Sequence, residues 1–140
     1  MNLENLVAVS GLSGIYKMAA NRNNGLIIED LSTGKKKFAS ARKHQFTPLE
    51  SIAIFTDDGD STELAKVFQY MLEKIGTHPP VSTNSKSEEL HAYFAEILPN
   101  YDRDRVFNGD IKKVIKWFNF LNERNLVSLS SPEKNNEEEE

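Results

Sequence analysis

The stretch LIIEDLSTGKKKFAS, residues 26–40, decides the expected fold. It holds two short segments, 26–30 and 36–40, that are rich in strand-forming residues and bounded by polar ones. Between them, Ser32-Thr33-Gly34 is a run of residue types that favour tight turns. We therefore predict two consecutive strands of an antiparallel sheet.

Further strands are expected on both sides of this stretch. The turn at residues 21–25 places a strand at 15–19 before it, and a fourth strand is expected at 52–55. The opening segment, residues 3–9, fits either one helical turn or an edge strand. Four or five short strands within residues 1–57 predict an SH3-like antiparallel β-barrel or a strongly bent sheet.

The pattern changes after residue 57, where apolar residues recur at helical spacing. Residues 58–76 predict a helix that packs on the strands, with Asp60 as its N-cap. Prolines and small polar residues in 77–86 indicate a linker. Residues 87–128 predict a helical hairpin whose second helix has Asp110 as its N-cap. The expected fold class is therefore α+β, a small sheet or barrel followed by a helical unit.

Composition excludes several kinds of site. The 140 residues include no cysteine, so disulfides, thiolate metal sites and cysteine nucleophiles are excluded. No apolar run reaches the roughly 20 residues of a membrane helix, and we expect a cytoplasmic protein. The net charge is -4, and residues 133–140, with five Glu and one Lys, account for all of it. We predict that residues 129–140 form a disordered acidic tail.

A basic cluster with one aromatic residue lies in the predicted sheet. Its members are Lys35, Lys36, Lys37, Phe38, Arg42 and Lys43. Cations that follow phosphates, together with a ring that stacks on a base, are typical of proteins that bind single strands or RNA. The same lysines can instead protect an edge strand from pairing with another sheet, and Phe38 alternates as a core residue would. Both interpretations stay open.

Two arginines alternate with acids in the connection before the last helix, as Asp102-Arg103-Asp104-Arg105. Alternating charges usually form local ion pairs that contribute little to stability. The alternative is that Arg103 or Arg105 binds a partner's carboxylate or phosphate with two parallel hydrogen bonds. Because Val106 follows, we expect the core to hold this loop in place, with one arginine partly buried.

No catalytic, metal-binding or cofactor-binding constellation can be assigned. The three histidines lie in separate segments, without a nucleophile-elbow motif near any of them. Glu88 and His91 form a single Glu-x-x-His motif, whereas a di-iron bundle needs two such motifs and two further glutamates. The acids of residues 57–60 are too crowded for a calcium loop and are better explained as helix caps. We expect a protein that is not an enzyme and needs no cofactor.

Several segments resemble an uncharacterised bacterial family, a domain of unknown function. They are SGLSGIYK (10–17), LESIAIFT (49–56), YFAEILPNYDRDRV (93–106), DIKK (110–113) and Trp117. The resemblance spans most of residues 1–124. It implies a bacterial, cytoplasmic protein and supplies no catalytic or ligand residues.

Two functions remain as hypotheses. The first is a non-enzymatic interaction module that binds another protein, which fits a small sheet followed by helices with no catalytic constellation. The second is a nucleic-acid-associated protein that binds single strands or RNA through the Lys35–Lys43 cluster.

Overall fold

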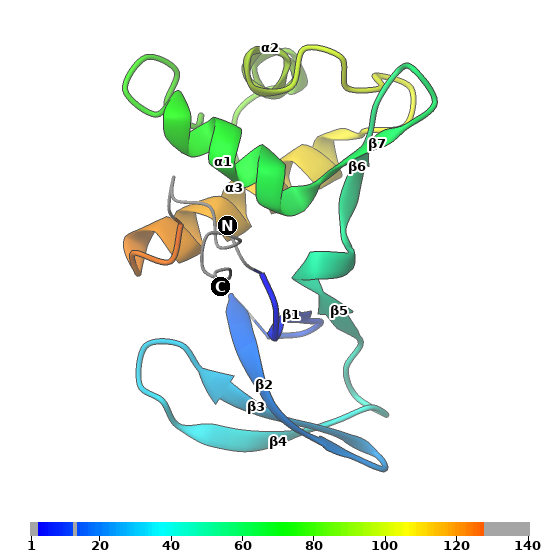
Figure 1. The fold of residues 1–140 in the computed structure, drawn as a ribbon, viewed down its shortest axis with the longest axis vertical. Helices are drawn as coiled ribbons and strands as arrows, with labels where there is room; N and C mark the ends of the chain where they lie inside the picture. Colours follow the sequence, from blue (N-terminus) through cyan, green and yellow to red (C-terminus); the bar gives the residue numbers. More distant parts are fainter. Residues whose placement is uncertain (1–2, 13, 128–140) are drawn as a thin grey trace, which may run out of the picture. The chain divides into compact units, whose positions relative to one another are not determined.

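A computed structural model describes residues 3–12 and 14–127. These residues form two compact units, Leu3–Ile52 and a second unit that begins at Ala53 (Figure 1). The predicted acidic tail, residues 129–140, lies outside the described residues.

The first unit is a five-stranded antiparallel sheet with the strand order β4-β3-β2-β1-β5. A short 3-10 helix, η1, follows β5. Because β4 and β5 are the two edges and do not pair with each other, the expected barrel is not confirmed, whereas the antiparallel sheet is. The elements are β1 (Leu6–Val9), β2 (Ile15–Arg22), β3 (Gly25–Asp30), β4 (Lys36–Ser40), β5 (Phe46–Pro48) and η1 (Leu49–Ser51).

One face of this sheet carries its core, since side chains alternate between the two faces of a strand. The buried members are Val7, Val9, Leu26, Ile28 and Ala39, and Leu12, Tyr16, Met18 and Phe46 pack against them. A bulge between residues 18 and 20 shifts the register of β2 against β3. The ambiguous opening segment becomes the strand β1, which pairs with both β2 and β5. Asn5, directly before it, has left-handed backbone at φ 66°.

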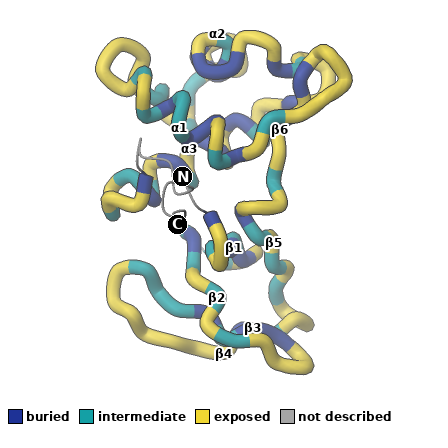
Figure 2. The backbone as a smooth tube through the Cα atoms, viewed as in Figure 1, coloured by how far each residue is buried: buried dark blue, intermediate teal, exposed yellow. Residues whose placement is uncertain are grey.

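The second unit combines a two-stranded hairpin with three helices. Its elements are β6 (Ala53–Phe55), β7 (Ser61–Glu63), α1 (Leu64–Glu73), α2 (Ser87–Ile97) and α3 (Asn108–Glu123). The fully buried residues Phe68, Phe94 and Phe118 contribute to its core, and the rings of Phe68 and Phe118 are 6.0 Å apart. Figure 2 shows each helix with buried positions among exposed ones. Together, the sheet and the helices confirm the α+β class.

The two predicted helix caps are wrong. Residues 61–63 pair with 53–55 as a hairpin, so α1 begins at Leu64 and Asp60 lies in the hairpin turn. Asp110 lies inside the first turn of α3, where its carboxylate accepts a hydrogen bond from the N–H of Phe107 at 2.9 Å. Each carboxylate still accepts a backbone hydrogen bond, Asp60 from the N–H of Ser61 and Asp110 from that of Phe107, but the N-caps are Glu63 and Phe107.

Hydrogen bonds connect the N-terminal half of α2 to the first residue of α3. Ser87 Oγ lies 2.9 Å and His91 Nε2 lies 2.8 Å from Asn108 Oδ1. In an antiparallel hairpin with a short loop, the end of the first helix would lie beside the start of the second. The connection at residues 98–107 therefore runs back past α2, which differs from the expected hairpin. No helix of the described residues is long and apolar enough to cross a membrane.

Candidate functional site

The basic cluster of the first unit is divided between the two faces of the sheet. Cross-strand partners share a face, and β4 pairs Phe38 with Ile27 and Lys37 with Ile28. Because Ile28 is a core residue, Lys37 lies on the core face, where its Nζ is 5.6 Å from the centre of the Tyr16 ring. Phe38 lies on the opposite face and is 47% exposed, so it is not a core residue.

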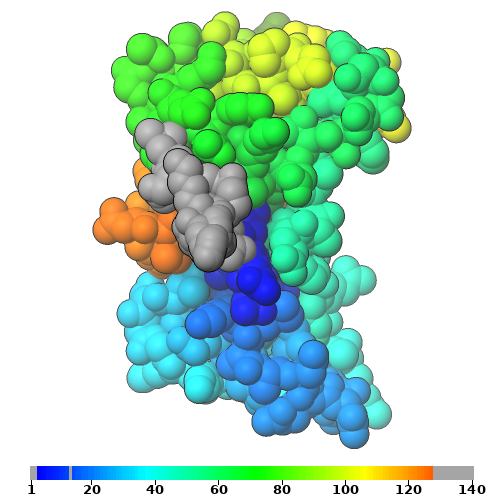
Figure 3. Space-filling model, in the orientation of Figure 1, coloured from blue at the N-terminus to red at the C-terminus, as the bar shows by residue number. Residues whose placement is uncertain are grey.

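The other cations of the cluster flank these two positions. Lys36 pairs with Glu29 and shares the face of Phe38. Lys35 precedes β4, and Arg42 and Lys43 lie in the turn that follows it. The space-filling view shows this light-blue to cyan part of the chain at the surface (Figure 3). The six residues are thus close in sequence, but they do not form one surface on one face of the sheet.

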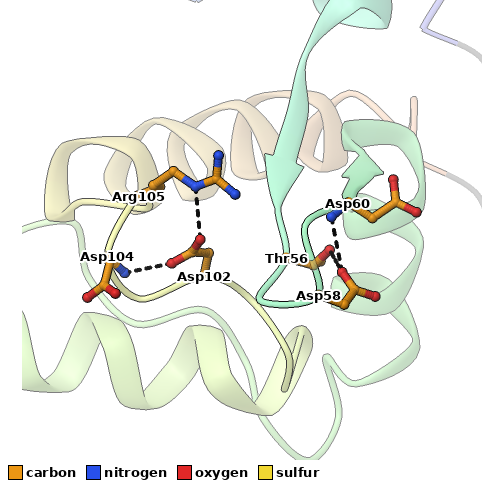
Figure 4. A network of polar contacts seen from close by, with 6 residues as sticks. All are labelled: Thr56, Asp58, Asp60, Asp102, Asp104 and Arg105. Carbon is orange, nitrogen blue, oxygen red and sulfur yellow. Dashed lines mark hydrogen bonds and ion pairs between the residues drawn. The ribbon is translucent and has the colours of Figure 1, made fainter.

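In the second unit, Arg105 is fixed on two sides. Its Nε donates a hydrogen bond to Asp102 Oδ2 at 2.9 Å (Figure 4). Its guanidinium lies 4.3 Å from the centre of the Phe55 ring. The hydrogen bond from Arg105, with a second from the N–H of Asp104, lowers the pKa of Asp102 below its ordinary value. The Arg105 side chain is 50% exposed. Its terminal nitrogens make no hydrogen bond to the described residues.

The loop that holds both arginines is anchored as expected at Val106, which is 3% exposed. Arg103 lies over the Tyr101 ring at 5.0 Å and donates a hydrogen bond to its hydroxyl at 3.2 Å. Both arginines are exposed, and the expected partial burial is limited to the packing of each guanidinium on a ring. Phe107, two residues beyond Arg105, is 63% exposed.

The turn between β6 and β7 lies beside the loop that holds the two arginines (Figure 4) and is hydrogen-bonded to it. The N–H of Asp102 donates to the carbonyl of Phe55, and the N–H of Asp57 donates to the carbonyl of Asn100. Within the turn, the buried Thr56 donates its hydroxyl proton to Asp58 Oδ1 at 2.6 Å, which lowers the pKa of Asp58. The acids of residues 57–60 therefore shape a turn, and the described residues hold no group suited to a metal ion.

A polar cluster around His91 is the feature that sequence reasoning missed. His91 Nδ1 lies 2.7 Å from the hydroxyl oxygen of Tyr101, and its Nε2 lies against Asn108. Glu88, the other member of the Glu-x-x-His motif, takes no part in these contacts. Burial raises the pKa of Tyr101, and the positive charge of Arg103 counteracts part of this effect. The partners come from separate elements, so no short motif could have indicated them.

Both units match families of unknown function. Residues 52–121 match the family described as "Domain of unknown function (DUF6852)". The chain belongs to the DUF6852 family. Residues 3–49 match a second description, "Domain of unknown function (DUF5606)". The expected resemblance to a family of unknown function is thereby confirmed.

A solved relative extends the match to nearly the whole chain. The solution NMR structure of a Bacteroides vulgatus protein, determined by a structural genomics consortium, is 36% identical to this chain with a TM-score of 0.75. The match covers 91% of each chain. Comparison with curated proteins gave no match. The DUF6852 match begins at residue 52, so the Arg105 loop and the His91 cluster belong to that domain, while the basic cluster belongs to the DUF5606 region.

Proposed function

We propose that this DUF6852 protein is a cytoplasmic, non-enzymatic module that binds another protein through an Arg105 surface, defined as Phe55, Arg105 and Phe107. The observation that carries the proposal is the exposure of two aromatic residues around a half-exposed arginine: Phe55, 45% exposed, whose ring contacts Arg105, and Phe107, 63% exposed and two residues beyond it in the sequence. Aromatic residues and arginine are the types most enriched at the energetic centres of protein interfaces.

The fixed position of Arg105 makes it suited to recognition. Asp102 holds Nε and the Phe55 ring covers one face, while the terminal nitrogens have no partner among the described residues. A carboxylate or phosphate can therefore accept two parallel hydrogen bonds from them. Less rotamer entropy is lost on binding when the side chain is already held in place.

The proposal is tested with a tagged full-length chain in native extract. We expect capture of a defined partner in fixed stoichiometry, which Arg105→Ala and Phe107→Ala each abolish, while Lys112→Ala on the exposed side of α3 retains it. Arg105→Lys should also weaken capture, because an ammonium cannot form the two-pronged contact. Equal capture by all of these variants, with circular dichroism showing intact folding, would refute the Arg105 surface.

The alternative function is binding of single-stranded nucleic acid or RNA by the Lys35–Lys43 cluster. The observation that favours it is that Lys36 and the exposed Phe38 share one face of the sheet. Binding should then fall steeply with salt. Lys36→Glu should weaken it more than Lys37→Glu, because Lys37 lies on the other face. Absence of binding to single strands at low salt would remove this alternative.

A further inference from the structure

The edge strand β4 has backbone groups that nothing in the sheet pairs. The N–H of Asp30 donates to the carbonyl of Lys35, and the N–H of Ala41 donates to the carbonyl of Asn24, both at 2.8 Å. Hydrogen-bonded pairs alternate along an antiparallel ladder. Between these two pairs, the residues that point their N–H and C=O away from β3 are therefore Lys36, Phe38 and Ser40. The carbonyl of Ser40 already accepts from the N–H groups of Lys43 and His44, which leaves Lys36 and Phe38 as the free positions.

The side chains around this edge define what can approach it. Lys36, Lys37 and Phe38 are all exposed, and Figure 2 shows exposed residues along most of β4. A second copy of β4 would place lysines against lysines, which disfavours self-pairing. A strand with acidic side chains would instead place carboxylates beside these lysines, which favours pairing. The other edge, β5, is only three residues long and ends in Pro48, which has no N–H.

Phe38 gives the edge more than a protective function. Its ring lies against Gly25, where an added Cβ would be 2.9 Å from Cζ, and it still remains 47% exposed. Lysines alone are enough to protect an edge from pairing, whereas an exposed ring beside them offers apolar contact to a partner side chain.

We propose that β4 binds an extended acidic segment of another protein as an added strand. Backbone hydrogen bonds would form at Lys36 and Phe38, acidic side chains would lie beside the lysines, and an apolar side chain would pack on Phe38. This site lies in the first unit, so it is independent of the Arg105 surface and goes beyond the proposed function.

The test uses the full chain and a blocked hexapeptide of alternating glutamate and valine. Nuclear magnetic resonance should show saturable binding, with amide hydrogen exchange at Lys36 and Phe38 slowed by at least about tenfold. When the valines pack on Phe38, the glutamates lie on the opposite face with Lys37. Lys37→Glu should therefore weaken binding by about tenfold or more, whereas Lys66→Glu, at an exposed position of α1, should leave it unchanged. Arg105→Ala should also leave it unchanged, which separates this result from the proposed function.

Two further probes identify the occupant. The same hexapeptide, N-methylated at alternate residues, keeps its charge but loses backbone donors, and we expect its binding to be lost. Equal binding of the methylated peptide, or no slowing of exchange at Lys36 and Phe38, would overturn the proposal.

Oligothymidylate is the nucleic-acid probe. Tighter binding of this probe than of the peptide, weakened by Lys36→Glu, would also overturn it and favour a nucleic acid.

Discussion

The hydroxyl oxygen of Tyr101 lies 2.7 Å from Nδ1 of His91 and connects the buried end of the Arg105 loop to α2. Asn108 Oδ1 lies against the other ring nitrogen of His91 and can only accept a hydrogen bond. His91 therefore carries its proton on Nε2, and Nδ1 accepts the proton of Tyr101. Hydrogen bonds therefore run from Arg103 through Tyr101 and His91 to Asn108, which indicates a structural role for His91.

Removal of the Tyr101 hydroxyl should destabilise the second unit. Tyr101→Phe leaves His91 Nδ1 and the Arg103 contact without their partner, and we expect a loss of about 1–2 kcal/mol in the free energy of unfolding. Urea denaturation measures it. Tyr70→Phe, at a half-buried position in α1, is the control and should change stability by less than about 0.5 kcal/mol. Equal effects of the two variants would contradict a structural hydrogen bond at Tyr101.

The opposite result is expected at Tyr93 in α2. Its hydroxyl is buried and has no hydrogen-bond partner among the described residues, and burial strongly raises its pKa. A buried hydroxyl without a partner costs desolvation free energy that phenylalanine avoids. Tyr93→Phe should therefore leave stability unchanged or raise it by about 1 kcal/mol in the same urea experiment. A loss comparable to that of Tyr101→Phe would show that the Tyr93 hydroxyl is bonded.

Local signals explain why some strands could be predicted. The turn at residues 32–34 and the segments beside it gave β3 and β4 almost to the residue, because turn chemistry and strand propensity act over a few positions. β5 pairs with β1, about 40 residues earlier, and its three residues have no pattern of their own. β7, with the polar sequence Ser61-Thr62-Glu63, is a strand only because β6 pairs with it.

The candidate site residues also differ in how far local sequence could predict them. The lysines and arginines could be listed from the sequence, but not which face each occupies, because that depends on the register of β4 against β3. Alternation then separates Lys36 from Lys37. The partners of His91 could not be foreseen, since Tyr101 and Asn108 reach it only through the path of the connection between α2 and α3.

Acid should weaken the two loops of the second unit. Hydrogen bonds to their ionised forms lower the pKa of Asp58 and of Asp102 below 3.8 in the folded chain. A carboxyl whose folded pKa is lowered stabilises the fold above its unfolded pKa, about 3.9, and loses this contribution as pH falls through the folded pKa. The free energy of unfolding should therefore decrease as the pH is lowered through about 4. In Asp102→Asn this decrease should be smaller than in the parent chain.

The control for this pH dependence is Asp104→Asn. The Asp104 side chain accepts no hydrogen bond from the described residues, so its removal should leave the acid profile of the parent chain intact. Urea denaturation at pH values between about 2.5 and 7 gives the comparison. Identical acid profiles for Asp102→Asn and the parent would show that the bond from Arg105 does not persist in solution.

Close packing at Gly25 should make the edge of the sheet sensitive to one added methyl group. A Cβ at this position would overlap the carbonyl oxygen of Ala39 and lie 2.9 Å from Cζ of Phe38. Gly25→Ala must therefore push β4 away from β3, and we expect a loss of about 1–3 kcal/mol. Gly109→Ala, where nothing lies within 4 Å, is the matched control and should stabilise α3 by up to about 1 kcal/mol. Thermal or urea unfolding separates the two, and a neutral Gly25→Ala would show that β4 does not pack against β3 at this end.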